Sequence, residues 1–324
     1  MEHRAALGLF LAVTTQRPTA ALTSRPSTLP SGKNGKAREN ARSLSRLMSS
    51  TASVDLVDVD ANLLHPALVD DVDHHIKVAS SVGVKQFVVP GSTLEDSKGA
   101  IELALRNPNV IFPTAGVHPY NVEECGPLDD AMAALSVLAQ RAEVRCVGEC
   151  GLDFSEGFPS AEGQLPWFER QVQIACQLKK PLFLHERLAS QEFTEVLKKY
   201  DALYGLPPCL VHCFTGTRQE LGIYLEMGFY IGITGFICKE KHGEALREMV
   251  KSIPLDRLMV ETDSPYLGFP GCREGYAKPK QQNPNVPSAL PKVVHALAKE
   301  MGTSYEDVAR RTTANTRAFF QMPT

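Results

Sequence analysis

The chain has 324 residues, of which 43% are hydrophobic and 22% are charged, and its formal net charge is −3. This is the composition of an ordinary globular protein, with enough apolar material for one large core. The small net charge gives no global signal for nucleic acid, so any such binding has to come from a local patch.

The first 52 residues differ from the rest of the chain. Residues 1–50 hold eight Lys or Arg against two Glu, whereas the remaining chain holds 26 basic and 35 acidic residues. This segment is also rich in Ser, Thr, Ala and Pro, which is typical of an organellar transit peptide or a disordered extension. A secretory signal is a further alternative. We therefore predict a disordered extension over residues 1–52 and one folded domain over residues 53–324. A transit peptide would direct the protein to a mitochondrion or another organelle; without one, the cytoplasm or nucleus is expected.

From Val54 onward, short apolar runs alternate with helical patterns. The eight strand-like runs are Leu56–Val59, Gln86–Val89, Ile111–Ala115, Val144–Gly148, Leu182–Leu184, Cys209–Val211, Tyr230–Ile233 and Leu258–Val260. Helical patterns include Glu95–Arg106, Asp129–Arg141 and Leu165–Lys179. Strands alternating with helices predict a parallel sheet of the α/β class, and eight units predict closure into a (β/α)8 barrel of the TIM type. A doubly wound open sheet is the alternative, but no Gly-rich phosphate turn follows the first run.

Four of the apolar runs lead directly into residues that can bind a metal. These residues are Glu149, His185, His212 and Asp263. In a barrel of parallel strands, the carboxyl ends of the strands meet on one face, where active sites lie. Two imidazoles and two carboxylates meeting there are suitable ligands for a divalent cation. A hydrogen-bonded core histidine or a turn-capping acid explains each residue alone, but four such strand ends in one chain favour a metal site.

Longer motifs around these residues carry a family resemblance. They are Ala115-Gly116-Val117-His118-Pro119, Gly148-Glu149-Cys150-Gly151-Leu152-Asp153-Phe154, Val211-His212-Cys213-Phe214-Thr215-Gly216, Tyr230-Ile231-Gly232-Ile233-Thr234-Gly235 and Glu261-Thr262-Asp263-Ser264-Pro265-Tyr266-Leu267. Through them the chain, from Val54 to Phe320, resembles the TatD family of metal-dependent deoxyribonucleases, within the amidohydrolase-type barrels. The resemblance implies a distorted eight-stranded barrel. It also implies hydrolysis of DNA phosphodiester bonds as a 3′–5′ exonuclease, with single-stranded DNA or 3′ ends as substrate.

The resemblance also implies a metal site. It assigns metal binding to the four residues already named, Glu149, His185, His212 and Asp263, with one or two ions. Mg²⁺ is expected, with Mn²⁺ or Zn²⁺ as alternatives. Glu149 and Asp263 are the expected catalytic residues, because Asp263 could also orient the attacking water or take its proton. Many relatives carry His-x-His after the first strand, where this chain has Asp60-Ala61-Asn62. Asp60 is therefore a further expected ligand, since carboxylates suit Mg²⁺, although a strand-end cap is its structural alternative.

Substrate-binding residues are expected around the metal. His118 would contact phosphate at the rim of the site, and Asp153 would lie beside it. Arg187 is the favoured phosphate-binding cation because it follows His185 by two residues, and Tyr266 offers a surface for base stacking. Each could instead be an ordinary surface side chain.

Two other functions stay open at this point. Another metal hydrolase of this barrel type, acting on a small amide, ester or phosphotriester, commonly uses the His-x-His pair and a carboxylated lysine on the fourth strand. Glu149 stands at that strand here, which favours the nuclease. A non-catalytic binding protein would have no need of the whole ligand set. We further expect a monomer with no stable membrane association.

Overall fold

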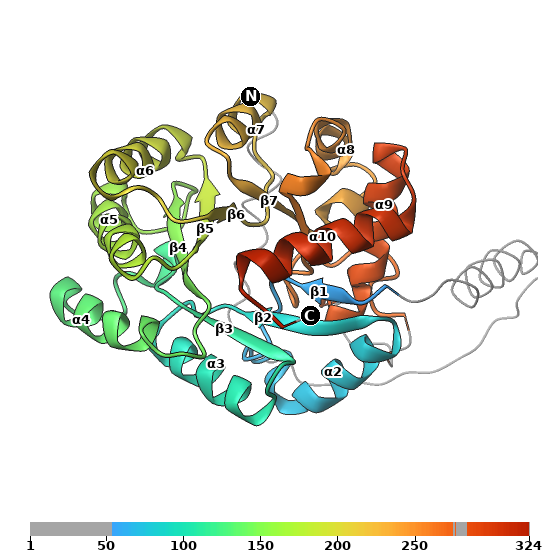
Figure 1. The fold of residues 1–324 in the computed structure, drawn as a ribbon, viewed down its shortest axis with the longest axis horizontal. Helices are drawn as coiled ribbons and strands as arrows, with labels where there is room; N and C mark the ends of the chain where they lie inside the picture. The colour runs from blue at the N-terminus through green and yellow to red at the C-terminus, as the bar shows by residue number, and fades with distance from the viewer. Residues whose placement is uncertain (1–53, 275, 277–283, 324) are drawn as a thin grey trace, which may run out of the picture. The chain divides into compact units, whose positions relative to one another are not determined.

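A parallel sheet forms the centre of the molecule. The computed structural model describes residues 54–274, 276 and 284–323. Its eight strands follow one another in the order β1 to β8, with helices on the outer side (Figure 1). The strands are β1 Leu56–Asp58, β2 Val84–Val89, β3 Ile111–Ala115, β4 Cys146–Asp153, β5 Leu182–Arg187, β6 Cys209–Val211, β7 Tyr230–Ile233 and β8 Leu258–Val260. The helices are α2 Val72–Ser81, α3 Leu94–Arg106, α4 Leu128–Ala139, α5 Ala161–Leu178, α6 Ser190–Tyr204, α7 Arg218–Glu226, α8 Glu244–Val250, α9 Leu290–Met301 and α10 Tyr305–Phe319.

This arrangement confirms the (β/α)8 barrel predicted from the alternation of strands and helices. The extension predicted over residues 1–52 lies outside the described residues. No helix of the described part of the chain combines the length and the hydropathy that a membrane span requires.

The barrel closes between its first and last strands, and the closing residues lie next to the site. The β1–β8 seam uses individual hydrogen bonds in place of a regular ladder, such as Val59 N–H to the Val260 carbonyl at 3.2 Å. Asp263 N–H likewise donates to the Asp60 carbonyl at 2.8 Å. The buried Asp58 carboxylate accepts from Thr262 through its amide at 2.8 Å and its hydroxyl at 2.6 Å. The seam therefore fixes the backbone that carries Asp60 and Asp263.

Strands β4 and β5 run further than the sequence predicts. The fourth strand was expected to end at Gly148, but β4 continues to Asp153 and pairs with β5 as far as Arg187. Gly151, at φ +153°, makes this pairing feasible, because a Cβ there would collide with the His185 carbonyl. His185 thus lies within the paired part of β5, whereas Glu149 lies where the register of β4 shifts, and its amide donates to the Gly91 carbonyl at 3.0 Å.

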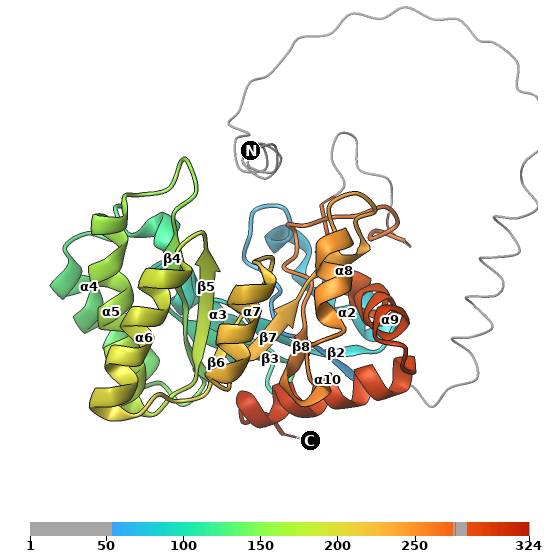
Figure 2. The same ribbon diagram turned by 90° about the horizontal axis from the view of Figure 1, so that it is seen from above.

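The end of α10 fills the base of the barrel. Its C-terminal side chains join strand residues in one apolar cluster, which comprises Val57, Val59, Val88, Phe112, Cys146, Phe183, Leu210, Met259, Phe319, Phe320 and Met322. Figure 2 shows α10 running across this end of the strands. Phe183 connects the cluster to the site, because its ring stacks on His212 with the centroids 4.9 Å apart. Because this apolar cluster closes one end of the barrel, the polar residues gather at the other end, where the strands have their carboxyl ends.

Candidate functional site

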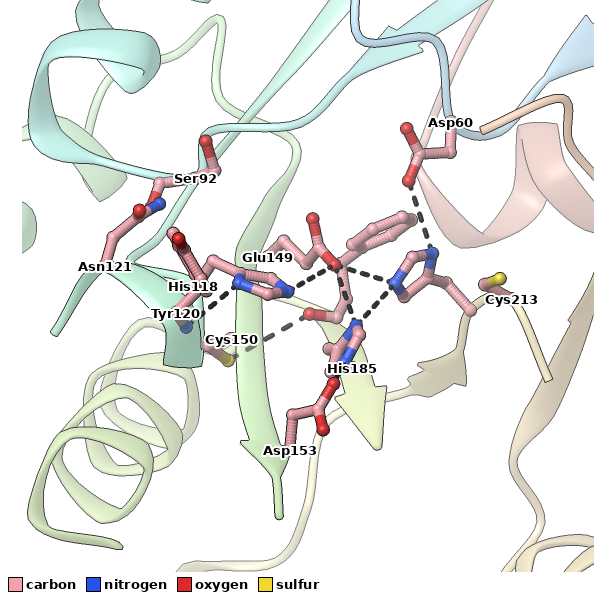
Figure 3. Close-up of polar contacts among 12 residues, drawn as sticks. Asp60, Ser92, His118, Tyr120, Asn121, Glu149, Cys150, Asp153, His185 and Cys213 are labelled. Atoms are coloured by element: carbon pink, nitrogen blue, oxygen red, sulfur yellow. Dashed lines mark hydrogen bonds and ion pairs between the residues drawn. The ribbon is translucent and has the colours of Figure 1, made fainter. Parts of the chain in front are cut away.

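The carboxylate of Glu149 is the centre of the polar cluster. Its Oε1 lies 2.7 Å from His212 Nε2, 3.2 Å from His185 Nδ1 and 3.4 Å from His118 Nε2. Figure 3 shows Glu149 between His118 and His185, with Asp60 and Asp153 further out. Residues from β4, β5 and the segments after β3 and β6 therefore meet at one point, as their strand positions predict.

Three of these atoms are spaced like ligands of one metal ion. Glu149 Oε1, His185 Nδ1 and His212 Nε2 form a triangle, whose third side, between the two nitrogens, is 3.3 Å. Ligand atoms about 2.1 Å from an ion in octahedral geometry lie about 3.0 Å from one another. The residues present therefore fit a divalent cation.

Each of the two histidines has a carboxylate on its other nitrogen. Asp153 Oδ2 lies 3.0 Å from His185 Nε2, and Asp60 Oδ2 lies 3.2 Å from His212 Nδ1. Asp153 is 1% exposed, and its Oδ1 accepts from the Ser155 amide at 2.8 Å. Each acid thus faces the ring nitrogen that points away from Glu149.

His118 differs from the other two histidines. Its Nδ1 accepts a hydrogen bond from the Tyr120 amide at 3.1 Å, so Nε2 carries the proton of the neutral ring. Burial lowers the pKa of His118 to about 4, so its contact with Glu149 at 3.4 Å involves a neutral imidazole. His118 is thus a donor at the edge of the cluster, although it lies within ligand distance of Glu149 and His185.

Asp263 stands apart from the triangle. Its Oδ1 accepts from Asn62 Nδ2 at 3.2 Å, and the same amide nitrogen donates to Asp60 Oδ1 at 3.0 Å. Asp263 is absent from the groups of donors spaced closely enough to share an ion. The structure thus brings Glu149, His185 and His212 together and places Asp263 beside them, with Asn62 between Asp263 and Asp60.

A further acid, Glu261, is fully buried next to His212. Its Oε1 accepts from the Cys213 amide and lies 3.8 Å from His212 Nδ1. Gly232 makes room for it, since a Cβ there would lie 2.8 Å from the same oxygen. Burial raises the pKa of Glu261 to about 8, so this carboxyl carries a proton at neutral pH.

Burial and neighbouring charges shift the pKa values of the cluster residues in different directions. Burial opposes the ionisation of Glu149, but the nearby imidazoles outweigh it and hold its pKa well below the usual range. Burial also opposes the protonation of His212, yet Glu149 and Asp60 raise its pKa well above the usual value. Asp60 has its pKa raised to about 6 by burial, while burial and the charge of Asp60 raise the pKa of Asp263. In the absence of a cation, bound protons offset the negative charge of these acids.

Two predicted substrate contacts lie at the rim. Arg187 is half-buried at the end of β5, and its side chain makes no hydrogen bond or ion pair with the other described residues. Tyr266 is 42% exposed, and its ring meets that of His65 edge-on, with the centroids 5.3 Å apart. On the other side, Tyr120 packs edge-on against Phe158 with a centroid separation of 5.2 Å. Within the described part of the chain, Arg187 therefore offers a cation at the rim, and Tyr266 and Tyr120 offer aromatic surfaces.

The sequence matches the family described as TatD related DNase over residues 57–321. The chain belongs to the TatD-related DNase family. The 3′-5′ ssDNA/RNA exonuclease TatD of Erwinia billingiae (strain Eb661) is 39% identical over 268 residues, covering 83% of this chain and all of that protein. The exonuclease of the same name from Salmonella typhimurium is 37% identical over 267 residues, covering 82% of this chain and 99% of that protein.

Solved structures share the fold of this chain. YjjV, a TatD homologue of Escherichia coli K12, has a TM-score of 0.71 at 25% identity and covers 83% of this chain and 98% of that one. A TatD family hydrolase of Entamoeba histolytica has the same TM-score at 24% identity, with coverages of 83% and 99%. The Escherichia coli phosphotriesterase homology protein shares the fold at 15% identity and a TM-score of 0.58.

Sequence reasoning missed two residues of this TatD-related site. Asn62 belongs to the Asp60-Ala61-Asn62 segment, but its link to Asp263 depends on the β1–β8 seam. Glu261 lies two residues before Asp263, and its buried position next to His212 becomes visible only in the structure. The Glu-Thr-Asp spacing was the available signal, because alternate residues near a strand end point to the same side.

Proposed function

We propose that this protein is a metal-dependent exonuclease that hydrolyses single-stranded DNA from its 3′ end. The observation that carries the proposal is the triangle of Glu149 Oε1, His185 Nδ1 and His212 Nε2, with sides of 2.7, 3.2 and 3.3 Å. Family membership supports phosphodiester hydrolysis, and relatives named as 3′-5′ ssDNA/RNA exonucleases support the polarity and the substrate.

In this proposal, Glu149, His185 and His212 hold the cation. A bound divalent cation lowers the pKa of water and neutralises charge on phosphoryl oxygens. Mg²⁺ is the proposed ion, because the His-x-His pair that many relatives carry after the first strand is replaced here by Asp60-Ala61-Asn62, and the loss of two imidazoles favours a hard cation over zinc. Asp263 is the proposed general base: its raised pKa makes it a stronger proton acceptor than a free aspartate.

The rim residues would bind the substrate. His118 presents Nε2–H, a hydrogen-bond donor suited to a phosphate oxygen, and Arg187 supplies a cation for the same group. Tyr266 offers a half-exposed ring, and unpaired bases stack on such rings without sequence preference. A single strand suits this arrangement, because its bases are free to reach the aromatic surfaces.

A nuclease assay tests the proposal. The purified protein is incubated with 5′-labelled single-stranded DNA, with and without Mg²⁺, next to the same oligonucleotide blocked at its 3′ end. We expect a Mg²⁺-dependent ladder that the 3′ block abolishes. Parallel reactions with Mn²⁺, Zn²⁺, duplex DNA, RNA and a small phosphotriester compare the alternatives. Turnover of the phosphotriester without turnover of DNA would replace the nuclease with a small-ester hydrolase.

Cation affinity should rise with pH. The carboxylates of Glu149 and Asp60 raise the pKa of His212 well above its usual value, and burial raises the pKa of Glu261 to about 8, so the metal-free centre carries protons near pH 7. A cation has to displace protons, and the affinity should increase up to about tenfold per pH unit for each proton released. Calorimetric titration with Mn²⁺ between pH 6 and 8, in two buffers of different ionisation enthalpy, measures that release. Equal affinities across this range would contradict the protonated centre.

A further inference from the structure

We propose that Asp60 is a positioning residue that fixes the tautomer of His212. Its carboxylate would hold the imidazole proton on Nδ1, so that the Nε2 lone pair faces the cation site, and Asp60 itself would not ligate the cation. The proposal rests on the proposed function, because it takes Glu149, His185 and His212 as the ligands.

The placement of the two groups carries the argument. Asp60 is fully buried, and the His212 side chain is 3% exposed. Asp60 Oδ2 lies 3.2 Å from Nδ1, while Nε2, on the opposite edge of the ring, lies 2.7 Å from Glu149 Oε1. A neutral imidazole has one N–H and one lone pair. A carboxylate facing Nδ1 favours the proton there, which leaves the lone pair on Nε2.

His185 repeats the arrangement with its nitrogens exchanged. Its Nε2 lies 3.0 Å from Asp153 Oδ2, and its Nδ1 faces Glu149 at 3.2 Å. Although the two histidines turn different nitrogens inward, each has a carboxylate on the outer nitrogen. Such carboxylates commonly orient metal-binding histidines. The shared pattern indicates that Asp60 and Asp153 have the same role toward the two histidines, which lie at the ends of the neighbouring strands β5 and β6.

A different role for Asp60 would be to ligate a second ion. Asp60, His212 and Glu261 also lie close enough together to hold one. That ion would need the lone pair of His212 Nδ1, whereas the Glu149 site needs the lone pair of Nε2, and a neutral imidazole cannot offer both.

The two oxygens of Asp60 face different groups. Oδ2 faces His212, and Oδ1 accepts from Asn62 Nδ2 at 3.0 Å. Asparagine at position 60 would have one acceptor oxygen and one NH₂ group. It cannot accept from His212 and Asn62 together. In Asp60→Asn, either the new NH₂ group donates to Nδ1 and moves the proton to Nε2, or Asn62 loses its partner.

The test measures Mn²⁺ binding by electron paramagnetic resonance for the full chain and two variants. Asp60→Asn should weaken the affinity about 10–100-fold with no change in the number of ions bound. Glu186→Gln is the matched control, because both oxygens of the Glu186 carboxylate also have hydrogen-bond partners, the Ala189 amide and the Tyr224 hydroxyl, and neither partner belongs to the cluster. It should stay within about threefold of the parent, below the range for a residue that orients a ligand.

A second readout follows the tautomer directly. In the Zn²⁺-loaded parent, ¹⁵N NMR of labelled histidine should show His212 with a protonated Nδ1 and a ligating Nε2. Asp60→Asn should lose that Nδ1 signature. Because the parent spectrum needs no substitution, it decides the question even if Asp60→Asn fails to fold.

Several results would overturn the proposal. They are an unprotonated Nδ1 in the loaded parent, the loss of one bound ion in Asp60→Asn, or an affinity of Asp60→Asn equal to that of Glu186→Gln. In each of these results the parent still binds Mn²⁺ and cleaves DNA, so the result would refute only the role proposed for Asp60. A parent that binds no Mn²⁺ and cleaves no DNA would overturn the proposed function and this inference together.

Discussion

Replacing Glu149 with glutamine is expected to abolish Mn²⁺ binding and to lower kcat by about 10³-fold or more, the equivalent of the several kcal/mol that a catalytic cation supplies. Glu149 Oε1 lies within 3.4 Å of nitrogens from all three histidines of the cluster. Glutamine has nearly the same shape but carries no charge, and its amide oxygen is a weaker ligand. The variant should therefore fold and still fail to hold the cation. Calorimetry with Mn²⁺ and turnover of single-stranded DNA measure the two effects.

Glu186→Gln is the matched control for this substitution. Glu186 is also a carboxylate near the carboxyl end of a barrel strand, but it accepts from the Tyr224 hydroxyl at 2.6 Å and the Ala189 amide at 2.9 Å. Its replacement should leave Mn²⁺ affinity and kcat within about threefold, since activity is sensitive mainly to ligands and their direct partners. If Glu149→Gln binds Mn²⁺ as tightly as the parent, Glu149 is not a ligand and the triangle does not hold the ion.

The sequence allowed the barrel and the cluster to be predicted for the same reason. Each strand is a short apolar run, and parallel strands put the residues that follow them on one face. His212, directly after the short strand β6, fits this rule. Glu149 fits it less well, because β4 continues past it to Asp153. The continued pairing of β4 with β5 depends on contacts that local residue patterns do not report.

The partners of the ligands could not be predicted in the same way. Asn62 Nδ2 and Asp263 Oδ1 lie 3.2 Å apart but 201 positions apart in the chain. Likewise, nothing local indicates that Asp60 faces the outer nitrogen of His212. Residue types identify groups that can bind a cation. Which nitrogen turns inward, and which acid orients it, is decided by how the strands pack around the ring.

Asp263→Asn is expected to lower kcat by about 10²–10⁴-fold, the usual contribution of a general base, without loss of folding or of single-stranded DNA binding. The backbone permits this exchange, because Asp263 has a φ of +53°, and asparagine tolerates that region as well as aspartate does. The asparagine oxygen can still accept from Asn62. The substitution therefore removes charge and basicity while keeping the local structure.

The structure also argues against a capping role for the Asp263 side chain. If the side chain held the following turn, asparagine would replace it with little loss, because asparagine caps well. The turn is instead closed by the main chain, with Tyr266 N–H donating to the Asp263 carbonyl at 2.8 Å. Asp256→Asn, an exposed acid just before β8, provides the control and should keep the parent kcat. Turnover at saturating Mg²⁺ and fluorescence anisotropy with labelled single-stranded DNA separate catalysis from binding. A kcat for Asp263→Asn within about threefold of the parent lies outside the range of a general base and would remove Asp263 from the reaction.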